Sequence, residues 1–414
     1  MTLSEELSWR GFLEQTTFKD IKAIDNGGIS FYWGVDPSSD SMTIGNLAAA
    51  MMVRHFIKAG HKAYLLIGGA TGLIGDPDSK TTERELKSIE TISANKAAIT
   101  SQYQKLFKDQ SIEIVDNFDW FKDLNYLQFL REVGKFVPMR QMLNRDFVAS
   151  RLNDESNGIS YAEFSYSLIQ GYDFLTLFKV KGVTLQLSGA DQWGNCIAGV
   201  ELIRRITGKS ADIWTSPLIV DKSTGKKFGK SESGAVWLDP HKTTPTAFYQ
   251  FWINIADDEL ANFLKIYTFL NKDEIDELLL AHNNNPKDRL AQKRLASEVT
   301  TIVHGQGASK LAEAVTGYLT GERDLAQATD EELQAIRSEI PSVKINSDHS
   351  LINALVSTKL AKSNSEAKSL IDNGAIYVRN NTFKELNLKA EDFINGRLLI
   401  RRGKAFADSA LLEL

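Results

Sequence analysis

The sequence predicts an α/β protein with a parallel sheet, followed by an α-helical region and a small α+β module at its carboxyl end. The parallel sheet follows from two apolar strand signals, at 31–33 and 62–69, which a helical pattern at 44–52 separates. The helical region follows from apolar residues spaced three and four apart between 244 and 321. The final module combines two helical patterns with two strand signals.

Length and composition bound the possible functions. A chain of 414 residues with 43% hydrophobic content can form two or three domains. Its net charge of −5 argues against a surface that coats nucleic acid as a whole. Residues 348–414, however, hold ten Lys and Arg against eight Asp and Glu, so a local basic module is expected there.

Cysteine and histidine usage argues against disulfides and a bound metal. Cys196 is the single cysteine, and the six histidines are not at the spacing of metal ligands. The acidic amino-terminal segment lacks the apolar core of a signal peptide. No apolar run approaches the roughly 20 residues that cross a bilayer. We therefore expect a cytoplasmic protein without membrane or metal partners.

The stretch FYWGVDPSSDSMTIGNLAAAMM predicts a strand, a turn and a helix. Ser41 or Thr43 can cap the helix, which leaves Gly45 in its first turn. Glycine there costs about 1 kcal/mol of helix stability against alanine, so its presence suggests that a ligand lies against the helix start. The free N–H groups of that turn favour a phosphate or nucleotide. An ordinary strand-turn-helix explains this stretch equally well.

The segment GGATGLIGDPDSKTTERE follows the second strand. Its glycines match neither the dinucleotide fingerprint nor the phosphate loop. Asp76 lies just beyond the strand, where open α/β sheets bind ligands, and Lys80 and Arg84 follow. A surface turn would also explain Asp76. Residues 86–150 add helices and a strand at 111–115, and their apolar residues serve either a dimer contact or packing on the sheet.

A helical pattern from residue 161 brings three polar side chains to one face. Tyr166, Gln170 and Asp173 stand at positions i, i+4 and i+7 among apolar neighbours. Such a stripe indicates either a pocket for a small polar ligand or a solvated face. A strand at 183–188 then leads into GADQWGN, where Asp191 suits ribose hydroxyls and Gln192 can bond a ligand.

A strand at 214–220 precedes a loop rich in lysine, DKSTGKKFGKSESG. Mobile lysines among small residues can follow charge that moves between phosphates during a reaction. A generic basic surface loop is the alternative.

Taken together, these motifs resemble a known family. TIGN at 43–46 and KFGKS at 227–231 resemble the signatures His-Ile-Gly-His and Lys-Met-Ser-Lys-Ser of class I aminoacyl-tRNA synthetases. YWGVDPSSDS, GGATGLIGDP, the helix of Tyr166 and GADQWGN follow the order and chemistry of bacterial tyrosyl-tRNA synthetases. The resemblance covers most of the chain and implies a Rossmann-like catalytic domain that activates L-tyrosine with ATP and transfers it to tRNA.

The resemblance also implies roles for individual residues. Tyrosine would be held by Tyr32 and Asp173 at the phenol, by Asp76, Tyr166 and Gln170 at the ammonium group, and by Gln192 nearby. ATP would be held at its adenosine by Asp36, Gly45, Asn46, Gly189 and Asp191, and at its phosphates by Ser38, Thr43, Lys80, Arg84, Lys227, Lys230 and Ser231. Mg²⁺ would accompany ATP, no metal would be bound by the protein itself, and the enzyme would be a homodimer.

One position departs from the family pattern. Thr43 replaces the first histidine of the signature, and Asn46 replaces the second. Asparagine keeps a donor, whereas threonine offers a shorter, stiffer side chain with one hydroxyl, so its reach to the phosphates is in question. We expect activation to persist with the support of Lys227 and Lys230.

The carboxyl-terminal half is expected to serve tRNA. We predict a catalytic domain at 1–220, the lysine loop with an anticodon-side helical domain at 221–321, an acidic linker at 322–347 and a module resembling S4 RNA-binding domains at 348–414. Its expected phosphate contacts are Lys359, Lys362, Lys368, Arg379, Arg401, Arg402 and Lys404.

Two other functions compete with this interpretation. The chain could be an RNA-binding protein on a synthetase scaffold without catalysis, for which Thr43 is the main support. It could also be the related tryptophanyl enzyme. That reading fits poorly, because Tyr32 and Asp173 suit a phenol rather than an indole and because the chain carries an S4-like module.

Overall fold

The computed structural model describes residues 1–77, 86–143, 148, 158–220, 228, 230–231, 234–345, 350–379, 381–403 and 408–414. The chain divides into two compact units. The first comprises Met1–Lys242 and Ala256–Asn284, and the second comprises Thr243–Ile255 and Asn285–Leu414. Helices on either side of residue 285 therefore group with different units. The four segments expected from the sequence remain a prediction.

The first unit is built on a six-stranded sheet with the order β1-β6-β5-β2-β3-β4. Its strands are β1 (Gln15–Thr16), β2 (Ser30–Val35), β3 (Lys62–Ile67), β4 (Ile112–Asp116), β5 (Leu185–Gly189) and β6 (Asp212–Ser216), and a separate ribbon pairs β7 (Lys230–Ser231) with β8 (Gly234–Ala235). All pairs of the large sheet are parallel except β1 with β6. The predicted parallel sheet is confirmed, although the strand expected at 214–220 lies slightly earlier, at β6.

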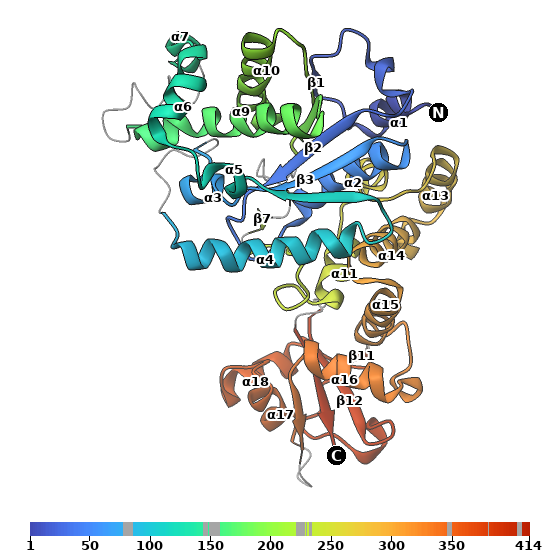
Figure 1. The fold of residues 1–414 in the computed structure, drawn as a ribbon. Helices are drawn as coiled ribbons and strands as arrows, with labels where there is room; N and C mark the ends of the chain where they lie inside the picture. Colours follow the sequence, from blue (N-terminus) through green and yellow to red (C-terminus); the bar gives the residue numbers. More distant parts are fainter. Residues whose placement is uncertain are drawn as a thin grey trace. The chain divides into compact units, whose positions relative to one another are not determined.

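Helices cover both faces of this sheet (Figure 1). The described helices of this unit are α1 (Leu3–Arg10), α2 (Ile44–Lys58), α3 (Thr71–Ile74), α4 (Ile89–Leu106), α5 (Phe118–Phe121), α6 (Tyr126–Glu132), α7 (Met139–Leu143), α9 (Tyr161–Lys181), α10 (Trp193–Thr207), α12 (Asp257–Tyr267) and α13 (Lys272–Asn284), with 3₁₀ turns η1 (Ile21–Ile24), η2 (Gly134–Phe136) and η3 (Ala190–Gln192).

The alternation of side chains along β2 divides the core between the two faces. Phe31 packs against Phe56 of α2 at 5.5 Å between ring centroids. Tyr32 points to the opposite face, where its ring lies 5.3 Å from that of Phe174 on α9. Since successive residues of a strand point to opposite faces, three aromatics in a row fit a strand that is buried on both sides.

The strand order fixes where a ligand can bind. From β2 the chain moves outward through β3 to β4, then returns to β5 on the other side of β2 and continues to β6. The order therefore reverses between β2 and β5. In open α/β sheets a crevice forms at the carboxyl ends of the strands at such a point.

The second unit combines helices with a five-stranded sheet of order β11-β10-β12-β13-β9. Its elements are α11 (Pro245–Ile253), η4 (Pro286–Asp288), α14 (Leu290–His304), α15 (Gln306–Thr320), η5 (Leu325–Gln327), α16 (Asp330–Glu339), β9 (Ser342–Lys344), α17 (Leu351–Ser357), α18 (Asn364–Asp372), β10 (Ile376–Val378), β11 (Asn381–Thr382), η6 (Ala390–Asp392), β12 (Arg397–Arg402) and β13 (Ser409–Glu413).

Part of the segment expected to be a linker is folded. Helix α16 begins with a capping box, in which the Thr329 side chain caps the helix and the Glu332 side chain bonds back. Leu333 and Ile336 are buried against Leu411 of β13. Asp330 and Glu331 are exposed, whereas Glu332 accepts a hydrogen bond from the Tyr318 hydroxyl at 3.0 Å, so the acidic composition that suggested a linker belongs to a packed helix. No helix in the described ranges is long and apolar enough to span a membrane.

Candidate active site

A cavity of about 470 Å³ opens at the crevice between β2 and β5. Thirteen of the residues predicted for tyrosine and ATP line it. They are Tyr32, Asp36, Ser38, Thr43, Gly45, Asn46, Asp76, Tyr166, Gln170, Asp173, Gly189, Asp191 and Gln192. Tyr32, Gln170 and Asp173, which are far apart in the sequence, thus line one cleft together with Gly45.

One end of the cavity presents a phenol beside a buried carboxylate. Tyr32 is 2% exposed, and among the described residues its hydroxyl has no hydrogen-bond partner. Asp173 is 1% exposed and accepts hydrogen bonds from Trp120 Nε1 at 2.9 Å and Asn117 Nδ2 at 3.1 Å. Burial raises the pKa of Asp173 well above its usual range, and the two donors oppose that rise. The Tyr32 hydroxyl thus lacks a bond that a ligand at this end could supply.

Asn117 is a site residue that sequence reasoning missed. It is fully buried directly after β4, and its Nδ2 also donates to Thr71 Oγ at 3.0 Å. Its Oδ1 accepts the Ala70 N–H at 2.6 Å. Asn117 therefore connects Asp173 to the segment that follows β3. The rule that singled out Asp76 and Asp191, a polar residue at the carboxyl end of a parallel strand, would have found it.

A second polar cluster surrounds Asp36. Tyr166 donates its hydroxyl to Asp36 Oδ2 at 2.7 Å, and Thr71 donates to Oδ1 at 2.6 Å. Gly68 makes room for this carboxylate, because a Cβ there would come within 2.0 Å of Oδ1. Burial, followed by the charge of Asp36, raises the pKa of Tyr166 well above its usual value. Tyr166 is therefore a neutral donor at physiological pH.

Asp76 and two amide side chains lie at the same end of the cavity. Gln192 donates to Asp76 Oδ2 at 2.6 Å and accepts from Asn195 Nδ2 at 3.1 Å. Gln170 Oε1 is buried, and the described part of the chain offers it no hydrogen-bond partner. Carboxylates and an open amide oxygen form an environment that suits a cationic donor such as an ammonium group.

The start of α2 lines the same cavity. Thr43 is the N-cap residue, as one of the two sequence alternatives expected. Both its N–H and its hydroxyl donate to Asn46 Oδ1, at 3.0 and 3.1 Å. Gly45 in the first turn and Asn46 line the cavity. Backbone N–H groups at a helix start favour an anion there.

Several predicted residues cannot be compared with the structure. Lys80, Arg84, Lys227 and Lys404 lie outside the described residues. Lys230 and Ser231 are described through their backbone alone, as strand β7.

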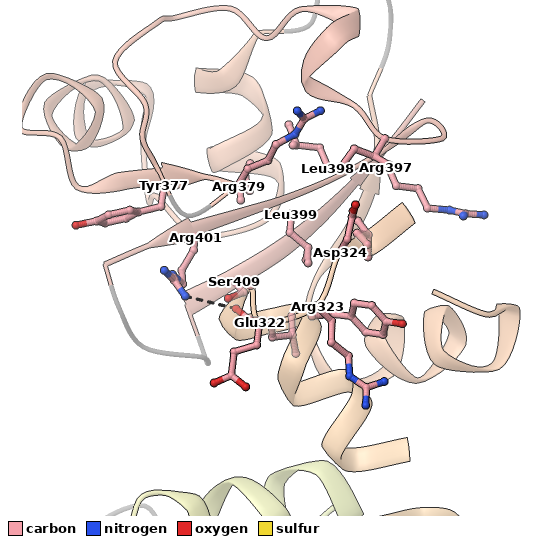
Figure 2. A pocket seen from close by; sticks show the side chains of 16 residues that line it. Glu322, Arg323, Asp324, Tyr377, Arg379, Arg397, Leu398, Leu399, Arg401 and Ser409 are labelled. Atoms are coloured by element: carbon pink, nitrogen blue, oxygen red, sulfur yellow. Dashed lines mark hydrogen bonds between the residues drawn. The ribbon is translucent and has the colours of Figure 1, made fainter. Parts of the chain in front are cut away.

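The described residues predicted to contact RNA fall into two groups. Lys359, Lys362 and Lys368 are exposed at α17 and α18, and Arg402 donates to Leu360 O at 3.0 Å beside them. Arg379 and Arg401 line a different pocket, of about 520 Å³, between the end of α15 and the carboxyl-terminal sheet (Figure 2).

The arginines of this second pocket already have bonds within the protein. Figure 2 draws the bond from Arg401 Nη1 to Leu319 O, which measures 3.4 Å. Arg379 donates to the carbonyls of Glu391 and Asp392. Arg401 and Arg402 are neighbours in β12 and therefore face opposite sides of the sheet, so the predicted contacts that the structure describes fall into two separate groups.

Comparisons with known proteins agree with this geometry. Residues 25–320 match the family model "tRNA synthetases class I (W and Y)", and residues 332–406 match "Tyrosine--tRNA ligase SYY-like C-terminal domain". The fold is that of a class I aminoacyl-tRNA synthetase.

Individual relatives indicate which of the class I aminoacyl-tRNA synthetases the chain resembles. The chain is 44% identical over 98% of both chains to a tyrosine–tRNA ligase of Streptococcus mutans. Among solved structures it resembles truncated mitochondrial tyrosyl-tRNA synthetases. That of Aspergillus nidulans has a TM-score of 0.70 and 28% identity, with 77% of this chain and 94% of that chain covered. That of Coccidioides posadasii has a TM-score of 0.67 and 29% identity, with 75% and 91% covered. The chain belongs to the family of bacterial tyrosine–tRNA ligases, and its activity is the ATP-dependent ligation of tyrosine to tRNA.

Proposed function

We propose that the cavity binds L-tyrosine and ATP side by side, forms tyrosyl-adenylate and then passes the tyrosyl group to the terminal adenosine of tRNA(Tyr). The observation that carries this proposal is that one cavity is lined by the buried Tyr32 and Asp173 side chains and by the start of α2, and that the Tyr32 hydroxyl has no hydrogen-bond partner among the described residues. Such an arrangement suits a ligand with a phenol at one end and a phosphate at the other.

Tyrosine would be selected through its hydroxyl. The phenol would donate to Asp173 and accept from Tyr32. Phenylalanine would leave the buried Tyr32 hydroxyl without a partner, at a cost of about 1–3 kcal/mol, and would deprive Asp173 of a bond beyond those from Asn117 and Trp120. Asp76, Tyr166 and Gln170 would receive the ammonium group, with Gln192 holding Asp76 in place.

ATP would lie along the other end. Asp36, Gly45, Asn46, Gly189 and Asp191 would contact the adenosine, and Asp36 would thereby lie between the two substrates. The phosphates would meet the remaining predicted residues, namely Ser38, Thr43, Lys80, Arg84, Lys227, Lys230 and Ser231. This assignment is supported by Gly45, which lets a ligand approach the start of α2, and by the positive end of the helix dipole there.

The reaction needs no nucleophile from the protein. The tyrosine carboxylate would attack the α-phosphorus, forming a C–O–P bond as the bond to the β-phosphate breaks and pyrophosphate leaves. A ribose hydroxyl of the tRNA would then attack the tyrosyl carbonyl and release AMP. Positioning and positive charge supply the catalysis in such a reaction.

We also propose that Mg²⁺ arrives with ATP. In the described ranges no group of three or more His, Cys, Asp or Glu side chains could hold a metal ion, which favours coordination by the phosphates. When bound, Mg²⁺ would neutralise charge on the leaving pyrophosphate.

The carboxyl-terminal module would bind tRNA through the exposed lysines at α17 and α18. Each phosphate contact makes affinity fall with added salt. Deletion of residues 348–414 should therefore weaken tRNA charging and spare adenylate formation. Equal loss of both activities would contradict this division of labour.

We further propose a cytoplasmic homodimer. Tyr126, Leu127, Met139 and Tyr161 are 58–73% exposed on α6, α7 and α9, an apolar surface suited to a second copy of this chain. The lone Cys196 is consistent with a reducing compartment. Sedimentation of wild type and Leu127→Asp tests the assembly, because a charge at this surface should yield monomers.

The test of the function is pyrophosphate exchange that depends on an added amino acid. Exchange with tyrosine supports the proposal, whereas exchange with none would favour a protein that binds RNA without catalysis.

A further inference from the structure

Asn117 has a side-chain amide whose orientation is fixed by the backbone. Its Oδ1 accepts the Ala70 N–H at 2.6 Å, and a backbone N–H can only donate. The other polar atom of the amide is therefore Nδ2, whose two protons go to Asp173 Oδ2 at 3.1 Å and to Thr71 Oγ at 3.0 Å. Because Asn117 is fully buried, this arrangement satisfies both protons of a group that water does not reach.

The direction of the Thr71 hydroxyl follows from that amide. Thr71 is 2% exposed, and its oxygen lies 3.0 Å from Asn117 Nδ2 and 2.6 Å from Asp36 Oδ1. Since Nδ2 donates to this oxygen, the single hydroxyl proton is left for the carboxylate, which accepts when it is ionised. Thr71 therefore donates to Asp36, and its hydroxyl has a partner on each side.

The second oxygen of Asp36 holds Tyr166. The Tyr166 hydroxyl donates to Asp36 Oδ2 at 2.7 Å, so its one proton is used and its oxygen can still accept. Tyr166 and Gln170 stand about one turn apart on α9 and line the same cavity. Gln170 Oε1 is a buried acceptor without a partner in the described ranges. Two oxygens of α9 can thus accept N–H donors from a ligand.

The segment GGATG after β3 makes room for these bonds. A Cβ at position 68 would come within 2.0 Å of Asp36 Oδ1 and 2.3 Å of Thr71 Oγ, distances that real contacts do not show. Glycine leaves both oxygens where they are. This segment matches neither the dinucleotide fingerprint nor the phosphate loop, and the bond between Asp36 and Thr71 explains its Gly68 and Thr71 instead.

We propose that Thr71 is a positioning residue for the ammonium group of tyrosine. Its hydroxyl holds the Asp36 carboxylate in the orientation that places Oδ2 at the Tyr166 hydroxyl, and Tyr166 then presents its oxygen to the ammonium group. The inference deepens the proposed function, because it rests on the contact proposed there between Tyr166 and the ammonium group. A group misplaced by about 1 Å can cost on the order of 100-fold in rate, so a residue that acts through others has a measurable effect.

The first test is Thr71→Val, which keeps the shape but replaces the hydroxyl by a methyl group. A methyl group cannot donate to Asp36 and cannot approach its Oδ1 to 2.6 Å, so the carboxylate must leave its present orientation. In pyrophosphate exchange, kcat/KM for tyrosine should fall about tenfold or more. In the Tyr166→Phe background the same substitution should change kcat/KM less than about threefold, because the hydroxyl that Thr71 positions is gone.

A second measurement separates positioning from a general disturbance of the cavity. The compound 3-(4-hydroxyphenyl)propionate carries the phenol and the carboxylate of tyrosine but no ammonium group. Its inhibition constant against tyrosine is measured in the same assay. Thr71→Val should change this constant less than about twofold, because no bond to an ammonium group is at stake. A general fault in the cavity would weaken both ligands alike.

Two further variants complete the design. Thr71→Ser keeps the hydroxyl and should hold kcat/KM for tyrosine within about threefold of wild type. Thr100→Val is the matched control, because Thr100 donates to Lys96 O at 2.8 Å within α4 and does not line the cavity. It should leave kcat/KM within about twofold.

Each contrary outcome has its own meaning. Equal losses in the wild-type and Tyr166→Phe backgrounds would overturn the positioning role, and so would a Thr71→Val enzyme that keeps the wild-type kcat/KM. Equal weakening of tyrosine and of the analogue, or a Thr71→Ser enzyme as slow as Thr71→Val, would overturn it too. A Tyr166→Phe enzyme as active as wild type would refute the proposed ammonium contact and the inference with it. A wild-type protein without exchange that depends on tyrosine would refute the proposed function itself.

Discussion

At the end of the cavity that carries Tyr32, the carboxylate of Asp173 is held by two buried donors, whereas at the start of α2 Thr43 and Asn46 bond mainly to each other. The first end is formed by buried side chains that surround the place proposed for the substrate's phenol hydroxyl. The second offers a helix terminus, small residues and, on the proposed assignment, lysines from a separate segment. On the proposed assignment, buried hydrogen bonds at the first end recognise tyrosine, whereas the second end also needs positive charge from other segments to hold the phosphates.

The largest expected effect comes from replacing Asp173 at the end of the cavity that carries Tyr32. Asp173→Asn keeps the shape but turns an amide donor toward the donors of Asn117 or Trp120. Loss of a bond to a charged group is worth about 1.5–3 kcal/mol, so kcat/KM for tyrosine should fall roughly 100-fold. Steady-state pyrophosphate exchange measures this kcat/KM. A KM for ATP that rises as much as the KM for tyrosine would show that the two ends are not separate.

A smaller loss is expected when the second phenol contact is removed. Tyr32→Phe deletes one neutral hydrogen bond, worth about 0.5–1.5 kcal/mol, so activation of tyrosine should fall about fivefold. Activation of phenylalanine should not fall, because no bond to that substrate is lost. Exchange with both amino acids measures the ratio. An unchanged ratio would mean that Tyr32 does not bond the phenol.

Asn117→Ala should change the pH dependence of tyrosine use. Burial raises the pKa of Asp173, and Asn117 lowers it by donating to the charged form. Without this donor the pKa rises further, so the acid limb of kcat/KM for tyrosine should move to higher pH. Trp120→Phe removes the other donor and should act in the same direction. An acid limb that moves to lower pH would contradict the role of Asn117.

The smallest effect is expected at the phosphate end. Thr43→His restores a longer side chain that can donate to phosphates, and it should leave activation equal to wild type or up to about threefold faster. The rate constant of adenylate formation measures it. A loss of tenfold or more would show that the cap formed by Thr43 and Asn46 carries a role that histidine cannot fill.

The sequence predicted the residues around Tyr32 and Asp173 better than the rest of the molecule. The spacing of Tyr166, Gln170 and Asp173 predicts one helical face, and all three line the cavity. Asn117 escaped notice because it follows an ordinary strand and is surrounded by aromatics. Its partners Asp173 and Thr71 are 56 and 46 residues away, distances that only the fold closes.

Other features could not be read from local pattern. Helix α16 lies in an acidic segment, and its apolar residues are explained only by their packing against α15 and β13. The contacts of Phe228 with Phe263 and Tyr267 join segments about 35 residues apart in sequence, and no periodicity links them. Local spacing predicts helices and strands, whereas contacts across the fold determine which side chains meet.

The central claim is that the cavity selects a phenol and activates it with ATP. Pyrophosphate exchange by the wild-type protein, measured with each of the twenty amino acids, tests it most directly. We predict exchange with tyrosine far above that with phenylalanine or tryptophan. Exchange with no amino acid, or equal exchange with phenylalanine, would contradict the account.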